Sequence, residues 1–316
     1  MIDNISPILL EGLQVLTILV AAPIFVGWVR VLKCWSQGRA SAGVFQPLRD
    51  ISRLLMKDTV LAQNASWIFT ATPYIVFGAV VMAGAIIPVI SVDLPLSAAS
   101  DIIALVALFA IARFFLALAG MDIGTAFGGM GASREMMVAS LAEPAMLMSI
   151  FTVSLVSNST SLSQMAHVMT MDPVLLRPSL AFALLSFVLV ALAETGRIPV
   201  DNPATHLELT MIHEAMVLEY SGRHLALIEW AGMMKLFLFA AIAISCFLPW
   251  GIAMKGDATM LPLSFLLLGV KLAFIGVFIV AIETVMAKMR IFRVPEFLGS
   301  AFLFATLGML SFFILE

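Results

Sequence analysis

Residues 101–120 read "DIIALVALFAIARFFLALAG", an almost unbroken apolar run with a single arginine, Arg113, inside it. An α-helix of about 20 apolar residues crosses the hydrocarbon core of a bilayer. The run is continuous rather than alternating, and a continuous run favours a helix over a strand of a membrane barrel. This stretch is therefore predicted to be a transmembrane helix.

The rest of the chain repeats this pattern. Its hydrophobic content is 62% and its mean hydropathy is +1.08, values outside the range of soluble domains. The net charge of −3 gives no indication of nucleic-acid binding, and two cysteines are too few for a cluster or a disulfide framework. We predict one all-α integral membrane domain over residues 1–316 with about eight transmembrane helices. The predicted spans are 8–32, 67–91, 101–120, 136–157, 176–194, 225–250, 261–287 and 297–315.

Basic residues predict the orientation of these spans. Twelve Lys and Arg residues surround the odd-numbered loops, and Arg177 and Lys255 alone occupy the even-numbered ones. The positive-inside rule therefore places the odd loops in the cytoplasm and both termini outside. The N-terminus has no basic region before its apolar run, so a cleavable signal peptide is not expected. The predicted cytoplasmic loops are about 33–66, 121–135, 195–224 and 288–296.

Several ionisable side chains fall within the predicted spans, with Glu194 at a boundary. A charge near the middle of a bilayer costs about 2.5–3.5 kcal/mol, so these groups are expected to face the protein interior, a partner subunit or water. Besides Glu11, they comprise three bases predicted near the midplane, Arg113, Lys235 and Lys271, and four acids predicted nearer the cytoplasmic ends, Glu143, Glu194, Glu229 and Glu283. Two interpretations stay open: buried ion pairs that fix helix packing, and a proton or ion path leading inward from the cytoplasm.

The longest of the later cytoplasmic loops, "ETGRIPVDNPATHLELTMIHEAMVLEYSGRH" (194–224), gathers three of the four histidines. Its "HEAMV" has Val217 where a zinc hydrolase needs a second histidine, so that class is excluded. His206 and His213 are seven residues apart and share a face of a helix that is predicted to begin near Pro203. A metal-binding pair and a protonatable pair both stay open, as does a purely interfacial helix.

The first cytoplasmic loop mixes basic and apolar residues in "QGRASAGVFQPLRDISRLLMKD" (37–58). This mixture predicts an amphipathic segment. It can serve attraction to anionic lipid headgroups or docking of a soluble partner.

Four segments share residues with one known family. They are "FQPLRDISRLLMKD" (45–58), "GASREMMVASLAEP" (131–144), "ETGRIPVDNP" (194–203) and "LEYSG" (218–222). Their order, their spacing and the eight-span topology resemble the membrane subunit of respiratory complex I that holds the foot of the quinone chamber. They also resemble its counterparts in membrane-bound group 4 [NiFe]-hydrogenases, including formate hydrogenlyase.

This resemblance implies an anchoring and coupling subunit of a redox-driven proton or sodium pump, without an active site of its own. It implies that the chain binds no cofactor, and that iron–sulfur clusters and a [NiFe] centre lie in partner subunits. A hydrogenase-related complex whose soluble partner has lost its nickel site stays open as an alternative. The implied partners are hydrogenase-like large and small subunits, a ferredoxin-like iron–sulfur subunit and antiporter-like membrane subunits, in the inner membrane of a bacterium or archaeon.

The resemblance also implies two sets of residues with different roles. The ion pathway would comprise Arg113, Glu143, Glu194, Asp201, Glu208, His213, Glu214, Glu219, Glu229, Lys235, Lys271 and Glu283. Docking of the soluble arm would use Arg39, Gln46, Arg49, Asp50, Arg53, Lys57, Arg134 and Arg197.

Departures from the complex I pattern help to decide whether the chain is more similar to the complex I subunit or to its hydrogenase counterparts. "GRASAG" (38–43) lacks the family's proline, "ATHLEL" (204–209) has Ala204 and His206 where acids are expected, and 209–219 is about three residues longer. These changes fall where a quinone headgroup would pass, so a hydrogenase-type complex is favoured over a quinone-site subunit of a quinone reductase. A stand-alone secondary transporter is the second alternative, and it would be expected to show an internal repeat.

Overall fold

The computed structural model describes residues 7–91, 95–96, 100–171, 177–197, 212–252, 260–286 and 293–315. Within these ranges the protein is helical, with extended pairing limited to an isolated bridge between Asp101 and Ser161. Seven of the described helices are long and apolar enough to cross a membrane, and a shorter apolar helix, α7, stands where the remaining span is predicted. The prediction of an all-α polytopic membrane protein is confirmed.

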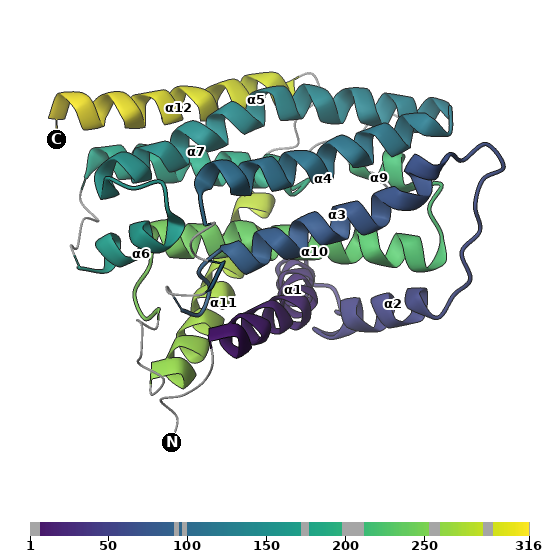
Figure 1. Cartoon of the computed structure of the whole chain (residues 1–316), viewed down its shortest axis with the longest axis horizontal. Coiled ribbons are helices and arrows are strands. Elements are labelled where there is room, and N and C mark those ends of the chain that lie inside the picture. The colour runs from purple at the N-terminus through teal and green to yellow at the C-terminus, as the bar shows by residue number, and fades with distance from the viewer. Residues whose placement is uncertain are drawn as a thin grey trace.

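Most of the long helices run side by side, whereas α1 and α11 pack against each other at an angle to the rest (Figure 1). Short helices α2 and α9 lie at one end of the bundle, called here the α2–α9 end, and α6 lies at the opposite end, the α6 end. The described helices are α1 (Pro7–Ser36), α2 (Gln46–Leu55), α3 (Trp67–Ile86), α4 (Ile102–Asp122), α5 (Ala126–Ser157), α6 (Leu162–Met171), α7 (Pro178–Glu194), α9 (His213–Val217), α10 (Gly222–Phe247), α11 (Leu261–Val285) and α12 (Val294–Leu315).

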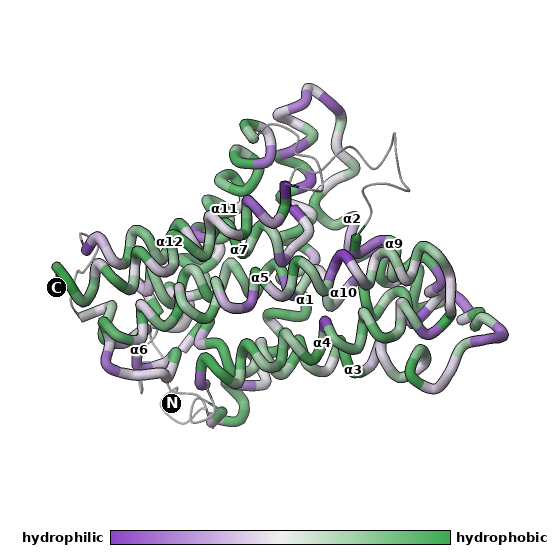
Figure 2. Tube along the Cα trace, turned by 90° about the horizontal axis from the view of Figure 1, so that it is seen from above, coloured by the Kyte–Doolittle hydropathy of each residue, from purple (hydrophilic) through white to green (hydrophobic). Residues whose placement is uncertain are grey.

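Hydrophobic residues cover most of the length of the long helices, and hydrophilic residues gather at the α2–α9 end (Figure 2). The basic residues of the first loop belong to this end, because α1 leads into α2 there. The positive-inside rule therefore predicts that the α2–α9 end is cytoplasmic.

Helix α5 is ten residues longer than the span predicted for it. Residues 121–135 were predicted to form a loop before a span at 136–157, but the helix begins at Ala126, where the Thr125 side chain caps it by accepting a bond from Gly128 N. Glycine has low helix propensity, yet small residues let neighbouring membrane helices approach closely, and here this packing prevails. As a result Glu143 lies in the middle of a 32-residue helix and not near the end that was predicted to be cytoplasmic.

The loop between α1 and α3, which contains α2, is fastened to the start of α10. As expected, α2 is amphipathic, and it buries Pro47 and Ile51. After α2, the Val60 backbone makes two hydrogen bonds with Ser221 Oγ: Val60 N donates at 2.8 Å and Val60 O accepts at 2.9 Å. These bonds hold the loop and the "YSG" segment together as one surface.

Tyr220 of the same segment is buried against α3. Its ring stacks on Phe69 with centroids 3.9 Å apart, and its hydroxyl donates to Phe69 O at 3.0 Å. Burial raises the pKa of Tyr220 above its ordinary value, so this phenol stays neutral. The tyrosine of "LEYSG" therefore fixes the entry to α10.

Candidate functional site

Arg113 of α4 lies at the centre of a buried charge cluster. Its Nη1 donates to Glu143 Oε1 of α5 at 2.8 Å, and its Nη2 donates to Glu194 Oε2 at the end of α7. Its Nε lies 3.7 Å from Glu135 Oε1, also of α5. One guanidinium thus faces three carboxylates, in keeping with the planar fork of an arginine side chain.

Lys235 of α10 completes this group. Its Nζ lies 2.9 Å from Glu194 Oε2, the oxygen that also accepts from Arg113. The five residues Arg113, Glu135, Glu143, Glu194 and Lys235 are called the Arg113 cluster. With every member ionised it holds two cations and three carboxylates, so one carboxylate is in excess.

The three carboxylates differ in access and in partners. The Glu194 side chain is 2% exposed and paired with two cations, whereas the Glu143 side chain is 34% exposed and paired with one. Glu135 is 16% exposed and has the longest of these contacts, 3.7 Å to Arg113 Nε, whereas Glu143 is the most accessible of the three. Because Glu194 pairs with both cations, loss of the Glu143 charge would leave neither Arg113 nor Lys235 unpaired and would bring the cluster to zero net charge.

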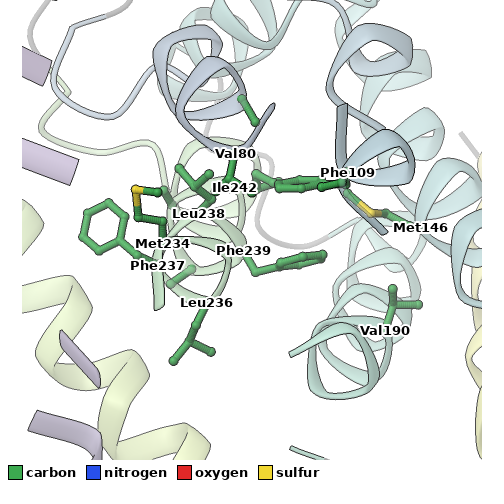
Figure 3. Packing of buried hydrophobic residues seen from close by; sticks show 14 of the residues in the cluster. Val80, Phe109, Met146, Val190, Met234, Leu236, Phe237, Leu238, Phe239 and Ile242 are labelled. Atoms are coloured by element: carbon green, nitrogen blue, oxygen red, sulfur yellow. The ribbon is translucent and has the colours of Figure 1, made fainter. Parts of the chain in front are cut away.

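A hydrophobic layer lies on the α6 side of the Arg113 cluster. Each helix that contributes a charged residue contributes an apolar one about a turn closer to the α6 end: Phe109 on α4, Met146 on α5, Val190 on α7 and Phe239 on α10. The rings of Phe109 and Phe239 stack with centroids 5.4 Å apart, and Figure 3 shows Met146 and Val190 near them. All four side chains are buried, so this layer separates the cluster from the α6 end.

A second, smaller charge cluster ties α11 to α1 and to the end of α7. Glu283 of α11 is bound through both oxygens: Arg197 Nη1 lies 2.6 Å from Oε1, and Lys33 Nζ lies 2.7 Å from Oε2. The Glu283 side chain is 6% exposed. Lys33, Arg197 and Glu283 are called the Glu283 cluster, and it has one cation in excess.

Lys271 lies apart from the acids with which it was predicted to form a path. Its Nζ donates to Leu248 O at 2.6 Å and to Trp250 O, the carbonyls that follow the last turn of α10. A cation there satisfies carbonyls that a helix end leaves free. Of the other predicted path residues, Glu229 is exposed on α10, and His213, Glu214 and Glu219 are exposed around α9.

Asp201, Glu208 and His206 lie outside the described residues. The proposed His206–His213 pair therefore stays a prediction. Among the residues that the structure does describe, no group of three or more His, Cys, Asp or Glu side chains could hold a metal ion.

The predicted docking residues divide into an exposed group and an inward group. Arg39, Arg49, Arg53 and Lys57 are exposed in the first loop. Gln46 Nε2 donates to Asp50 Oδ1 at 2.9 Å along α2, and Arg134 is half-buried on α5. Arg197, by contrast, is engaged within the chain by Glu283.

Glu135 is a member of the Arg113 cluster that sequence reasoning missed. It falls one residue before the predicted span 136–157, and the predicted boundaries therefore place it in a loop. Its position eight residues before Glu143 on the same helix was the available signal, and it needed the true start of α5.

Comparison with known proteins gives consistent matches. A family described as NADH dehydrogenase matches residues 10–314. Formate hydrogenlyase subunit 4 of Escherichia coli (strain K12) is 33% identical over 300 residues, which are 95% of this chain and 96% of that protein. Hydrogenase-4 component C of the same strain is 28% identical over 298 residues, 93% of this chain and 92% of that protein.

More distant matches extend the comparison. A subunit of the NADH-quinone oxidoreductase of Phocaeicola vulgatus is 28% identical over 210 residues, 65% of this chain and 58% of that protein. Among solved structures, the membrane-bound sulfane sulfur reductase, an archaeal respiratory membrane complex, contains a chain that superposes with a TM-score of 0.79 at 18% identity. The superposition covers 97% of this chain and 100% of that one, and at this identity it shows the shared fold alone.

Proposed function

Because the chain belongs to the NADH dehydrogenase family, whose matched segment spans residues 10–314, we propose that it is the anchoring and coupling subunit of a redox-driven ion pump. In this proposal it joins a cytoplasmic arm with iron–sulfur clusters and a [NiFe]-hydrogenase-like centre to antiporter-like membrane subunits. The complex would reside in the cytoplasmic membrane of a bacterium or archaeon. Near full-length similarity to subunits of formate hydrogenlyase and hydrogenase-4 supports the hydrogenase-like assignment.

The observation that carries the coupling role is the unequal charge of the Arg113 cluster. Three carboxylates face two cations, and Glu143 is the most accessible of the three. A site with one surplus acid responds to a nearby change of charge by binding or losing a proton. Electron transfer in a docked arm is such a change.

The hydrophobic layer of Phe109, Met146, Val190 and Phe239 supports a subunit that passes on a charge change rather than one that conducts ions itself. A charge that reaches Arg113 from the α2–α9 end meets buried apolar side chains in the direction of the α6 end. An ion would have to cross this dry layer at high cost. The charge change would therefore be passed sideways to a neighbouring subunit, and translocation would take place there.

Docking of the arm is assigned to the first loop. Arg39, Arg49, Arg53 and Lys57 form an exposed basic group, and the Ser221–Val60 bonds hold this loop on α10. A fastened basic surface fits an acidic protein partner, because binding then orders few additional side chains.

A quinone reductase is the second candidate. Similarity to the NADH-quinone oxidoreductase of Phocaeicola vulgatus favours it, but this similarity covers 65% of the chain, against 95% for formate hydrogenlyase subunit 4. Inhibitor-sensitive quinone turnover by the purified complex would support this candidate, whereas nickel content with hydrogen turnover would support the hydrogenase-type assignment.

The Glu143→Gln variant tests the coupling role in the intact complex. The complex is reconstituted into sealed vesicles, electrons are counted as oxidation of reduced methyl viologen and as hydrogen evolved, and H⁺ and Na⁺ uptake are followed. Glutamine keeps the shape of the side chain but cannot change charge, so we expect normal assembly and electron transfer with at least tenfold less ion uptake per electron. Glu296→Gln, an exposed position at the start of α12, is the matched control. Undiminished uptake in Glu143→Gln would refute the proposal.

A further inference from the structure

The last turn of α7 connects the two charge clusters. Glu194, the final residue of α7, belongs to the Arg113 cluster, and Arg197, three residues later, belongs to the Glu283 cluster. The two clusters have opposite excess charge, one carboxylate in the first and one cation in the second. Glu194 and Arg197 therefore lie three residues apart on one backbone segment but take part in different charge clusters.

This piece of backbone is rigid. Arg197 N donates to Leu192 O at 2.8 Å and Gly196 N donates to Ala193 O at 3.1 Å, while Gly196 has a φ of +64°. These are the two bonds and the left-handed residue of a Schellman motif, which closes the end of a helix. Thr195 Oγ1 adds a bond to Ala191 O at 2.6 Å. The position of Arg197 is therefore transmitted to Glu194 with little freedom.

Glu283 fixes the position of Arg197. Its two oxygens hold one cation each, and its side chain is almost fully buried, so the Arg197 pair is little screened by solvent. Lys33 on the other oxygen is 48% exposed, and an exposed partner contributes less. The Arg197–Glu283 ion pair is thus stronger than the Lys33–Glu283 ion pair, and it is the one that holds the end of α7.

From these contacts we propose that Glu283 is a positioning residue for ion coupling. Through Arg197 and the closed end of α7, it holds the Glu194 carboxylate between Arg113 and Lys235. Loss of the Arg197–Glu283 pair frees the end of α7, weakens the contacts of Glu194 and lowers the number of ions moved per electron. This inference rests on the proposed function of the Arg113 cluster and adds a second site, on α11, that tunes it.

A double-variant cycle tests this inference. Arg197→Gln, Glu283→Gln and the combination of both are compared in the vesicle assay described for Glu143→Gln, with assembly and electron transfer as internal references. We expect each single variant to lower ion uptake per electron at least twofold at unchanged electron transfer. The combined variant should be no worse than the singles, because both remove one and the same pair. Arg197→Lys, which keeps the charge, should restore most of the coupling.

Lys33→Gln is the matched control, since it removes a cation from Glu283 and leaves the Arg197 pair in place. Its ion uptake per electron should stay close to that of the unaltered complex. Effects that add in the combined variant, or a Lys33→Gln effect equal to that of Arg197→Gln, would overturn the positioning role. Normal coupling in Glu283→Gln alongside lost coupling in Glu143→Gln would overturn this inference alone. Normal coupling in Glu143→Gln would overturn the proposed function.

Discussion

Gly128 of α5 lies directly against Gly120 of α4, so closely that a Cβ atom on Gly128 would overlap the Gly120 carbonyl oxygen. The same Cβ atom would lie 3.0 Å from Thr125 Oγ1, the group that caps α5. The two helices that carry Arg113, Glu135 and Glu143 thus meet backbone to backbone near the α2–α9 end. This close approach sets the distance over which Arg113 reaches the two α5 carboxylates.

The first prediction concerns this helix contact. Gly128→Ala should destabilise the protein by about 1–3 kcal/mol, because α4 and α5 must separate to admit a methyl group. Gly129→Ala is the neighbouring control: its Cβ would meet nothing within 4 Å. That change should be neutral or stabilising by up to about 1 kcal/mol, since alanine is the better helix former. Thermal unfolding of the two purified variants measures the difference, and equal midpoints would contradict it.

Local patterns in the sequence were sufficient to predict the membrane spans, because a bilayer imposes both a length and a polarity on each helix. The start of α5 was misplaced for a physical reason. Segment 126–133 is rich in glycine and carries few large apolar groups, so it has neither the hydropathy nor the propensity of a span. Its helix depends on packing against α4, a tertiary effect that leaves no periodic signal. Glu135 was missed as a result.

The pairing of the charged residues was beyond prediction from the sequence for a similar reason. Depth along a span placed Arg113 and Lys235 in one group and Glu143, Glu194 and Glu283 in another, but depth does not say which helices are neighbours. The structure divides these acids between two clusters and gives Lys271 to the end of α10. The tertiary contacts between helices decide which partner a long, flexible charged side chain can reach.

The second prediction concerns Gly222 at the start of α10. It has a φ of +53°, and a Cβ atom there would lie 2.9 Å from Lys57 O and closer still to Asp58 O. Gly38 also has positive φ, +66°, but its Cβ would meet open space. Gly38→Ala should therefore cost only the left-handed strain of about 1–2 kcal/mol, while Gly222→Ala should cost more because it also displaces the first loop.

The measurement for Gly222 has two readouts. Thermal unfolding should show the larger loss in Gly222→Ala, and limited proteolysis should show faster cleavage of segment 57–65 in that variant. Equal proteolysis of the two variants would mean that the first loop is held by other contacts.

The third prediction separates Lys271 from Lys235. Lys271→Met removes a charged donor from the carbonyls of Leu248 and Trp250 and should cost about 1.5–3 kcal/mol of stability. Ion uptake per electron should stay unchanged, because Lys271 does not contact the acids of the Arg113 cluster. Lys235→Met should lower this ratio, since it removes one of the two cations on Glu194. A drop of equal size in both variants would show that Lys271 belongs to the pathway.

The fourth prediction concerns the hydrophobic layer. Phe239→Gln places an amide that can bind water next to Phe109, on the α6 side of Lys235, and should hydrate the layer. Vesicles that contain the resting complex should then take up protons several-fold faster under an imposed potassium diffusion potential. Phe239→Leu is the control, because it changes the packing but keeps the site apolar. If the two variants leaked equally little, Phe239 would not be part of the barrier, and the charge at Arg113 would be held back from the α6 end by some other part of the bundle.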